Sequence, residues 1–180
     1  MENHSMHGSK MNNDAQKHSL ENMPASGHSQ HKDHYVKLLI MMVLSFIAMY
    51  ILMYAMVDKL ANVIPNYNQF FMAGLMSAPM LIIEMAVMGK MYPNKKLNLA
   101  LLGAGVVLLS LFWFAIRGQA GIKDEQFLKS MIPHHAGALL MVEQSDLSDP
   151  EIKKLGEDII KSQEKEIQFM KAKIKQLEAK

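Results

Sequence analysis

The sequence predicts an all-α protein in which three transmembrane helices are followed by an antiparallel helical hairpin. Three stretches of about twenty residues are almost free of charge, and a helix of that length crosses a hydrocarbon core of about 30 Å. The last third of the chain instead repeats apolar residues at spacings of three and four among charged ones. That pattern is typical of amphipathic helices packed side by side.

The composition narrows the classes of function. The formal net charge of +2 is spread so that no segment carries a strong basic field, and we expect no nucleic-acid partner. The chain has no cysteine, which excludes disulfides, thiol nucleophiles and cysteine-based zinc sites. Methionine is unusually frequent, at 18 of 180 residues. It serves either as a flexible apolar filler or as a ligand for a soft metal.

Residues 1–34 are predicted to form a disordered tail rich in His and Met. The tail holds six of the eight His but almost no large aliphatic residues, so it buries too little surface to offset its ordering entropy. His28, His31 and His34 have a spacing that could close around a metal ion. The alternative is a solvated spacer without a metal role.

The transmembrane region is expected within residues 35–117, with spans at about 38–57, 70–89 and 97–116. Lys90, Lys95 and Lys96 lie in the second loop, whereas the first loop has only Lys59. By the positive-inside rule the second loop and the N-terminus are cytoplasmic, and the C-terminal hairpin is periplasmic or extracellular. We expect an integral protein of a bacterial inner membrane. Arg117, on the far side, opposes this orientation.

The second span combines a methionine stripe with a carboxylate. An ionisable residue inside a span is costly and suggests a function, and Met80 and Met88 are the nearest neighbours of Glu84 on the same helix face. These three residues are weaker metal-ligand candidates. The alternative is that the stripe is a packing seam and that Glu84 reaches toward the headgroups or Lys90.

The hairpin is expected over residues 122–180. Its first helix begins at Asp124, and Ser148 is predicted as the N-cap of the second helix, with Pro150 in the first turn. The short connection makes the two helices antiparallel neighbours. The predicted seam of the first helix consists of Phe127, Met131, His134, Ala138 and Met141. The predicted seam of the second consists of Ile152, Leu155, Ile159, Gln163, Ile167, Met170, Ile174 and Leu177.

Two adjacent imidazoles and a thioether mark the first helix of the hairpin. Met131, His134 and His135 lie at three-and-four spacing, so they reach neighbouring points near one surface. Adjacent residues diverge by about 100°, so both imidazoles bind one ion only if it lies between helices or between subunits. Thioether and imidazole without thiolate favour copper, and Cu(I) in particular. The alternative is that His134 and Gln163 hydrogen-bond across the seam.

These residues resemble the DUF305 family, which has a Met-x-x-His-His segment followed by a Gln-x-x-Glu-Ile-x-x-Met segment. Here the segments run from Met131 to His135 and from Gln163 to Met170. The resemblance implies a ferritin-like helical bundle, membrane attachment or export, and copper binding as in some members. It makes Met131, His134, His135 and Met170 the ligand candidates, with Gln163 and Glu166 in support. Met141 is a further supporting candidate because it follows on the His134 face of the same helix. Many members carry the two-helix unit twice, so a chain with one unit is expected to form a homodimer or higher homo-oligomer through the hairpin.

The sequence therefore favours a membrane-anchored metal-handling protein that binds copper at the exported hairpin, for sequestration or delivery. One alternative is a copper-conducting transporter that uses the methionine stripe of the second span, which includes Met72 and Met76. Another is a structural or interaction module with no metal role. We do not expect an enzyme, because the chain has no His-Glu-x-x-His, nucleophile elbow or phosphate-binding glycine loop.

Overall fold

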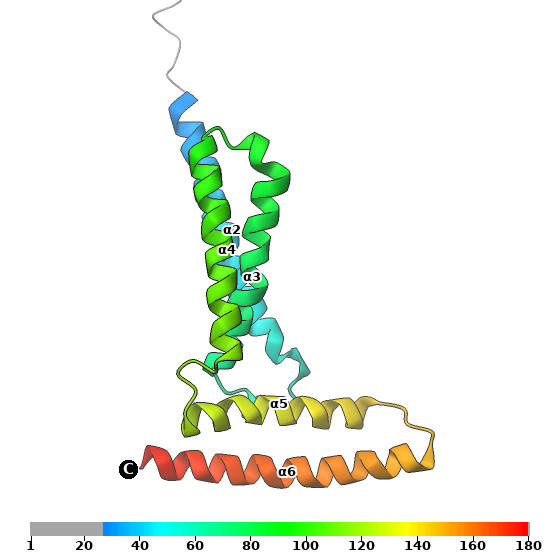
Figure 1. Cartoon of the computed structure of the whole chain (residues 1–180). Coiled ribbons are helices and arrows are strands. Elements are labelled where there is room, and N and C mark those ends of the chain that lie inside the picture. Colours follow the sequence, from blue (N-terminus) through cyan, green and yellow to red (C-terminus); the bar gives the residue numbers. More distant parts are fainter. Residues whose placement is uncertain (1–26, 180) are drawn as a thin grey trace, which may run out of the picture. The chain divides into compact units, whose positions relative to one another are not determined.

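The computed structural model describes residues 27–179, and every regular element in that range is a helix (Figure 1). The α-helices are α2 (Gly27–Leu52), α3 (Tyr67–Met88), α4 (Lys95–Arg117), α5 (Asp124–Gln144) and α6 (Pro150–Glu178). The short 3-10 helices are η1 (Met53–Met56), η2 (Leu60–Asn62) and η3 (Gly89–Met91). The all-α prediction is confirmed. Of the described residues, 27–37 and 38–179 fall in two separate units.

The first helix begins earlier than predicted. Residues 27–34 were expected to belong to the disordered tail, but α2 begins at Gly27. Extending a helix by one residue is far easier than nucleating one, and no proline lies between Pro24 and the end of α2 at Leu52. The apolar stretch that follows therefore extends its helix into the polar residues before it. The prediction for the rest of the tail concerns residues outside the described range.

Three helices are long and apolar enough to cross a membrane. They cover Asp33–Met56, Tyr67–Met91 and Lys95–Arg117, close to the predicted spans. The first span changes at Met53 from an α-helix to the tighter η1, as is common at helix ends. Asn66 caps the start of α3, because its side-chain oxygen accepts a hydrogen bond from the backbone N–H of Gln69 at 2.9 Å.

Small residues allow α3 and α4 to pack closely. A Cβ added at Gly74 would overlap the ring of Phe112, and one added at Gly105 would lie 2.8 Å from Cγ1 of Ile82. Each glycine therefore makes room for a bulky side chain of the opposite helix. Close approach at small residues is how helices associate in lipid, so the α3–α4 pair fits a membrane location.

The hairpin consists of α5 and α6, which run antiparallel and side by side (Figure 1). Its N-cap prediction was wrong by one residue. Asp149, rather than Ser148, accepts hydrogen bonds from the backbone N–H groups of Glu151 and Ile152, at 2.8 and 3.1 Å. Aspartate ahead of Pro150 is a strong cap. The buried core of the hairpin comprises Ile132, Ala136, Leu139, Ile167, Met170 and Ile174.

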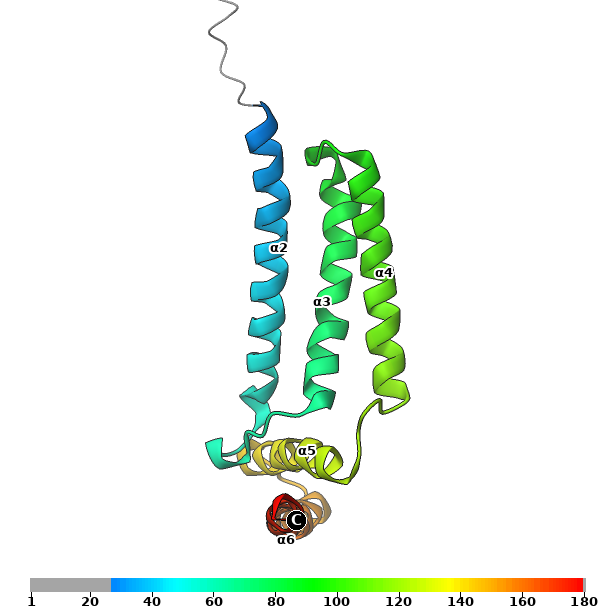
Figure 2. The ribbon, with the colours of Figure 1, turned by 90° about the vertical axis from the view of Figure 1, so that its left-hand side faces the viewer.

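The seam predicted for α5 was also wrong by one residue. Ile132, His135 and Leu139 are buried, while the predicted seam residues Phe127 and Met141 are 51% and 54% exposed. One residue turns a helix by about 100°, so the predicted seam lies on a second face. That face is apolar for another reason: α5 also contacts η1, η2 and α3, crossing the ends of the long helices (Figure 2).

The seam predicted for α6 holds in its C-terminal half. Ile167, Met170 and Ile174 are buried, whereas Ile152 and Leu155 are more than half exposed. Gly156 is buried in the N-terminal half instead, where an added Cβ would lie 2.9 Å from Val142. The two helices thus approach closely at a glycine there, and the larger apolar residues face outward.

Candidate metal centre

A cavity of about 470 Å³ lies between α5 and the ends of the first two spans. Its lining combines one imidazole, that of His134, with five thioethers and several side-chain amides. The thioethers belong to Met53, Met56, Met72, Met131 and Met141, and the amides to Asn66, Asn68 and Gln69. The cavity therefore concentrates soft donors at one place in the fold.

Three separate elements bring these side chains together. Met131, His134 and Met141 come from the second face of α5, Met53 and Met56 come from η1, and Met72 comes from the second turn of α3. The backbone of η1 lies directly on α5, because a Cβ added at Gly137 would be 3.5 Å from the carbonyl oxygen of Met56. An alanine would just fit at position 137, whereas a side chain longer than that of alanine would meet η1.

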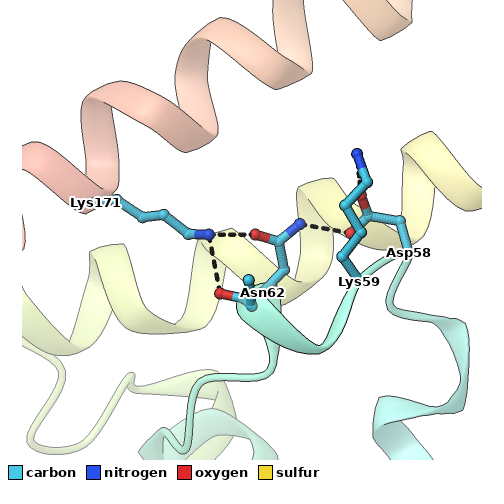
Figure 3. Close-up of polar contacts among 5 residues, drawn as sticks. Asp58, Lys59, Asn62 and Lys171 are labelled. Carbon is cyan, nitrogen blue, oxygen red and sulfur yellow. Dashed lines mark hydrogen bonds and ion pairs between the residues drawn. The ribbon is translucent and has the colours of Figure 1, made fainter.

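The loop after η1 is fastened to α6 by a polar cluster (Figure 3). Lys171 Nζ donates to the Ala61 carbonyl at 2.9 Å and to Asn62 Oδ1 at 2.6 Å. Asn62 in turn donates through Nδ2 to Asp58 Oδ1. The Asp58 side chain is 2% exposed, and its second oxygen lies 3.7 Å from Lys59 Nζ. We call the two bonds from Lys171 the Lys171 contact, which holds the loop, and with it η1, against the hairpin.

His135 points away from the cavity, into the hairpin. Its Nδ1 lies 2.9 Å from the Met131 carbonyl oxygen and its Nε2 lies 2.7 Å from Glu166 Oε2. A carbonyl and a carboxylate are both acceptors, so both ring nitrogens of His135 are placed at hydrogen-bonding groups of the hairpin rather than at the cavity. The two imidazole centroids are 6.2 Å apart and their planes meet at 63°.

The structure thus divides the predicted ligand set. Met131 and His134 reach the cavity together with Met141. Met170 is 6% exposed and packs in the hairpin core, on the same side of α5 as His135. Glu166 is the hydrogen-bond partner of His135.

The weaker candidates lie elsewhere. Glu84 accepts a hydrogen bond from the Tyr92 hydroxyl at 3.0 Å, which gives this carboxylate a polar partner near the end of α3. Met80 and Met88 are on α3 but do not line the cavity. His34 is exposed on α2, and the side chains of His28 and His31 lie outside what the structure describes. Gln163 is half-buried on α6.

The donor set of the cavity suits copper. Thioether sulfur and imidazole nitrogen bind Cu(I) in preference to harder cations. No three His, Asp or Glu side chains come together between residues 27 and 179 in a way that could hold a metal ion. The sequence indicated Met72 as part of the methionine stripe of the second span, but nothing in the spacing indicated that this stripe meets His134 and the methionines of η1.

Comparison with known proteins identifies one part of the chain as a family domain. Residues 115–177 match the family model described as a domain of unknown function, DUF305. An uncharacterized protein of Acanthamoeba polyphaga mimivirus is 33% identical over 136 residues, which cover 74% of this chain and 88% of the relative. That similarity extends beyond the 115–177 range. No solved structure matches the chain.

Proposed function

The chain belongs to the DUF305 family, and from this premise we propose that it is a membrane-anchored metal-handling protein that binds copper, as Cu(I), for sequestration or delivery. The single observation that carries the proposal is the cavity lined by His134 and five methionines. Thioethers are weak ligands for most biological cations but good ligands for Cu(I). Sequestration or delivery needs a site of this kind and no catalytic group.

Copper binding is tested by competition titration of the full chain in mild detergent with a Cu(I) chelator. A His134→Ala, His135→Ala double variant is expected to lose at least about tenfold in Cu(I) affinity, since loss of a group at a metal site typically costs that much. Equal affinity of variant and wild type would contradict the proposal. Circular dichroism of both proteins controls for loss of the helical fold.

We propose that the protein lies in a bacterial inner membrane with its N-terminus in the cytoplasm and the α5–α6 hairpin exported. The three long apolar helices support the membrane location. The lysines of the second loop, Lys90, Lys95 and Lys96, support the orientation. Reporters that work in one compartment, fused to either end, test it. An exported N-terminus would reverse the orientation and favour the transport alternative.

We also propose that the hairpin self-associates into a homodimer or higher homo-oligomer. Ile152, Leu155 and Phe169 of α6 are 51%, 58% and 66% exposed, and a second copy would cover such a face and restore a four-helix bundle. Chemical crosslinking and sizing in mild detergent test this proposal. A monomer under all conditions would contradict it.

The second candidate function is copper conduction through the spans. Met72, which lines the cavity, is the first residue of a methionine stripe along α3 that continues with Met76 and Met80. A conducting protein would move copper across vesicles that contain it, whereas a binding protein would only retain copper. Copper flux into such vesicles therefore separates the two candidates.

A further inference from the structure

We infer that Met53, Met56 and Met72, at the ends of the first two spans, complete the Cu(I) site of the hairpin, so that one chain supplies a whole site. The inference rests on the proposed function, since it names the remaining ligands of that site. These methionines lie outside the 115–177 segment that matches the family. The metal would therefore join the family domain to the membrane region of the same chain.

The face of α5 cannot easily supply all the ligands itself. Met131 and Met141 are separated by about 15 Å along the helix axis, at about 1.5 Å per residue. A metal–sulfur bond is only about 2.3 Å long, so an ion held by both would need both side chains fully extended toward each other. An ion near Met131 and His134, one turn apart, takes its remaining donors from whatever faces them. Those groups are the methionines of η1 and α3 and the amides of Asn66, Asn68 and Gln69, of which the thioethers are the softer donors.

The methionines of the cavity differ from those that fill a core. Met85 and Met170 are each 6% exposed and pack among apolar side chains. Met56, Met72 and Met141 are 53%, 40% and 54% exposed, although all three line one cavity. These side chains are thus not enclosed in a core and leave part of their surface uncovered.

Contacts that need no metal hold the two sides of the cavity together. The Gly137–Met56 backbone approach seats η1 on α5, and the Lys171 contact fastens the following loop to α6. Asn66, itself on the cavity wall, caps α3 ahead of Met72. A site whose supporting groups are fixed in advance binds without first ordering them.

The test replaces Met53, Met56 and Met72 together by leucine, which keeps apolar volume and removes sulfur. A matched control replaces Met41, Met42 and Met91, at least partly exposed methionines of α2 and η3 that do not line the cavity. We expect the cavity variant to lose at least about tenfold in Cu(I) affinity and the control variant to keep that of wild type. X-ray absorption of the Cu(I)-loaded proteins should show fewer sulfur neighbours in the cavity variant only.

Wild-type affinity and sulfur count in the cavity variant would overturn the inference. If the His134→Ala, His135→Ala variant still loses affinity in that case, the proposed function stands. If that variant also binds as wild type does, the proposed function fails as well. An equal loss in the control variant would overturn the inference too, because the cavity would then have no special role. Should the triple variant not be helical, Met56→Leu and Met72→Leu single variants give the same comparison.

Discussion

The two faces of α5 differ in what they contact and in what they can do. One face, with Ile132, His135 and Leu139, is buried against α6. The other, with Met131, His134 and Met141, faces a cavity of about 470 Å³ and the ends of the spans. The buried face stabilises the hairpin, and the open face carries the thioethers and the imidazole that line the cavity, although Met131 also packs against the hairpin core. One short helix thus serves both as part of a core and as one wall of a candidate site.

The two adjacent histidines show the difference most clearly. His135 has both ring nitrogens within hydrogen-bond distance of fixed acceptors, whereas His134 is exposed and lines the cavity. A pair of histidines in a sequence suggests one joint ligand set. A rotation of about 100° between neighbours instead assigns one imidazole to the hairpin and the other to the site.

The largest effect is expected on the buried face. Leu139 is 2% exposed, so Leu139→Ala should lower the stability of the hairpin by about 2–5 kcal/mol through the cavity it creates. Met141→Ala, on the open face, should cost less than about 1 kcal/mol because little area is lost. Denaturant unfolding followed by circular dichroism measures both. Equal losses would mean that the faces do not differ as described.

The Lys171 contact is expected to matter next. Lys171→Met removes both hydrogen bonds and leaves the oxygen of the 5% exposed Asn62 side chain without this donor, at a cost of about 1–3 kcal/mol. We expect the variant to weaken the attachment of the loop to α6 and to leave the packing of α5 on α6 unchanged. Hydrogen exchange should become faster at residues 58–62 and stay unchanged at residues 132–139. Faster exchange in the core alone would refute this division.

The hydrogen bond between His135 and Glu166 should contribute less. Glu166→Gln replaces a charged acceptor at 2.7 Å by a neutral amide. The Glu166 side chain is 56% exposed, so solvent screening holds the expected loss to about 1 kcal/mol. Thermal unfolding measures it, with Glu164→Gln, on the exposed surface of α6, as the matched control. An unchanged midpoint would show that His135 is held by packing alone.

The smallest effect concerns Lys129, near the start of α5, which pairs with Glu178 at the end of α6. Its hydrogen bond to Glu125 raises the pKa of Lys129 above the ordinary 10.5, and the bond to Glu178 adds to the rise. A raised pKa means that this stability is fully present below pH 10.5 and is lost as the pH rises through the higher folded value. Because such pairs are screened, Lys129→Gln should cost below about 1 kcal/mol at neutral pH and nothing at strongly alkaline pH. The free energies of unfolding of wild type and of Lys129→Gln, measured over a series of pH values, check both expectations.

The sequence predicted the long helices well because their signal is local. A charge-free stretch of about twenty residues needs no knowledge of its neighbours to be read as a span, and all three agree with the helices that are long and apolar enough to cross a membrane. The start of α2 was less predictable. It depends on how far a formed helix extends into residues such as His28 and His31 that neither favour nor break it.

The site was predicted only in part because its geometry is tertiary. The Met-x-x-His-His segment predicted that Met131, His134 and His135 lie near one surface, and Met131 and His134 line the cavity while His135 does not. The helix α5 is apolar on two sides, and periodicity does not say which side faces α6. Met56 and Met72 belong to different spans, and only the contact of η1 and α3 with α5 brings them to His134. No spacing within one helix contains that information.

The Cu(I) affinity of two single variants, His134→Gln and His135→Gln, tests the central claim most directly. Glutamine keeps a hydrogen-bonding side chain and removes the imidazole in both, and competition titration of the full chain gives the two affinities under the same conditions. The division of α5 into a structural face and a metal-binding face predicts a loss of at least about tenfold for His134→Gln and near wild-type affinity for His135→Gln. A loss confined to His135→Gln would contradict it.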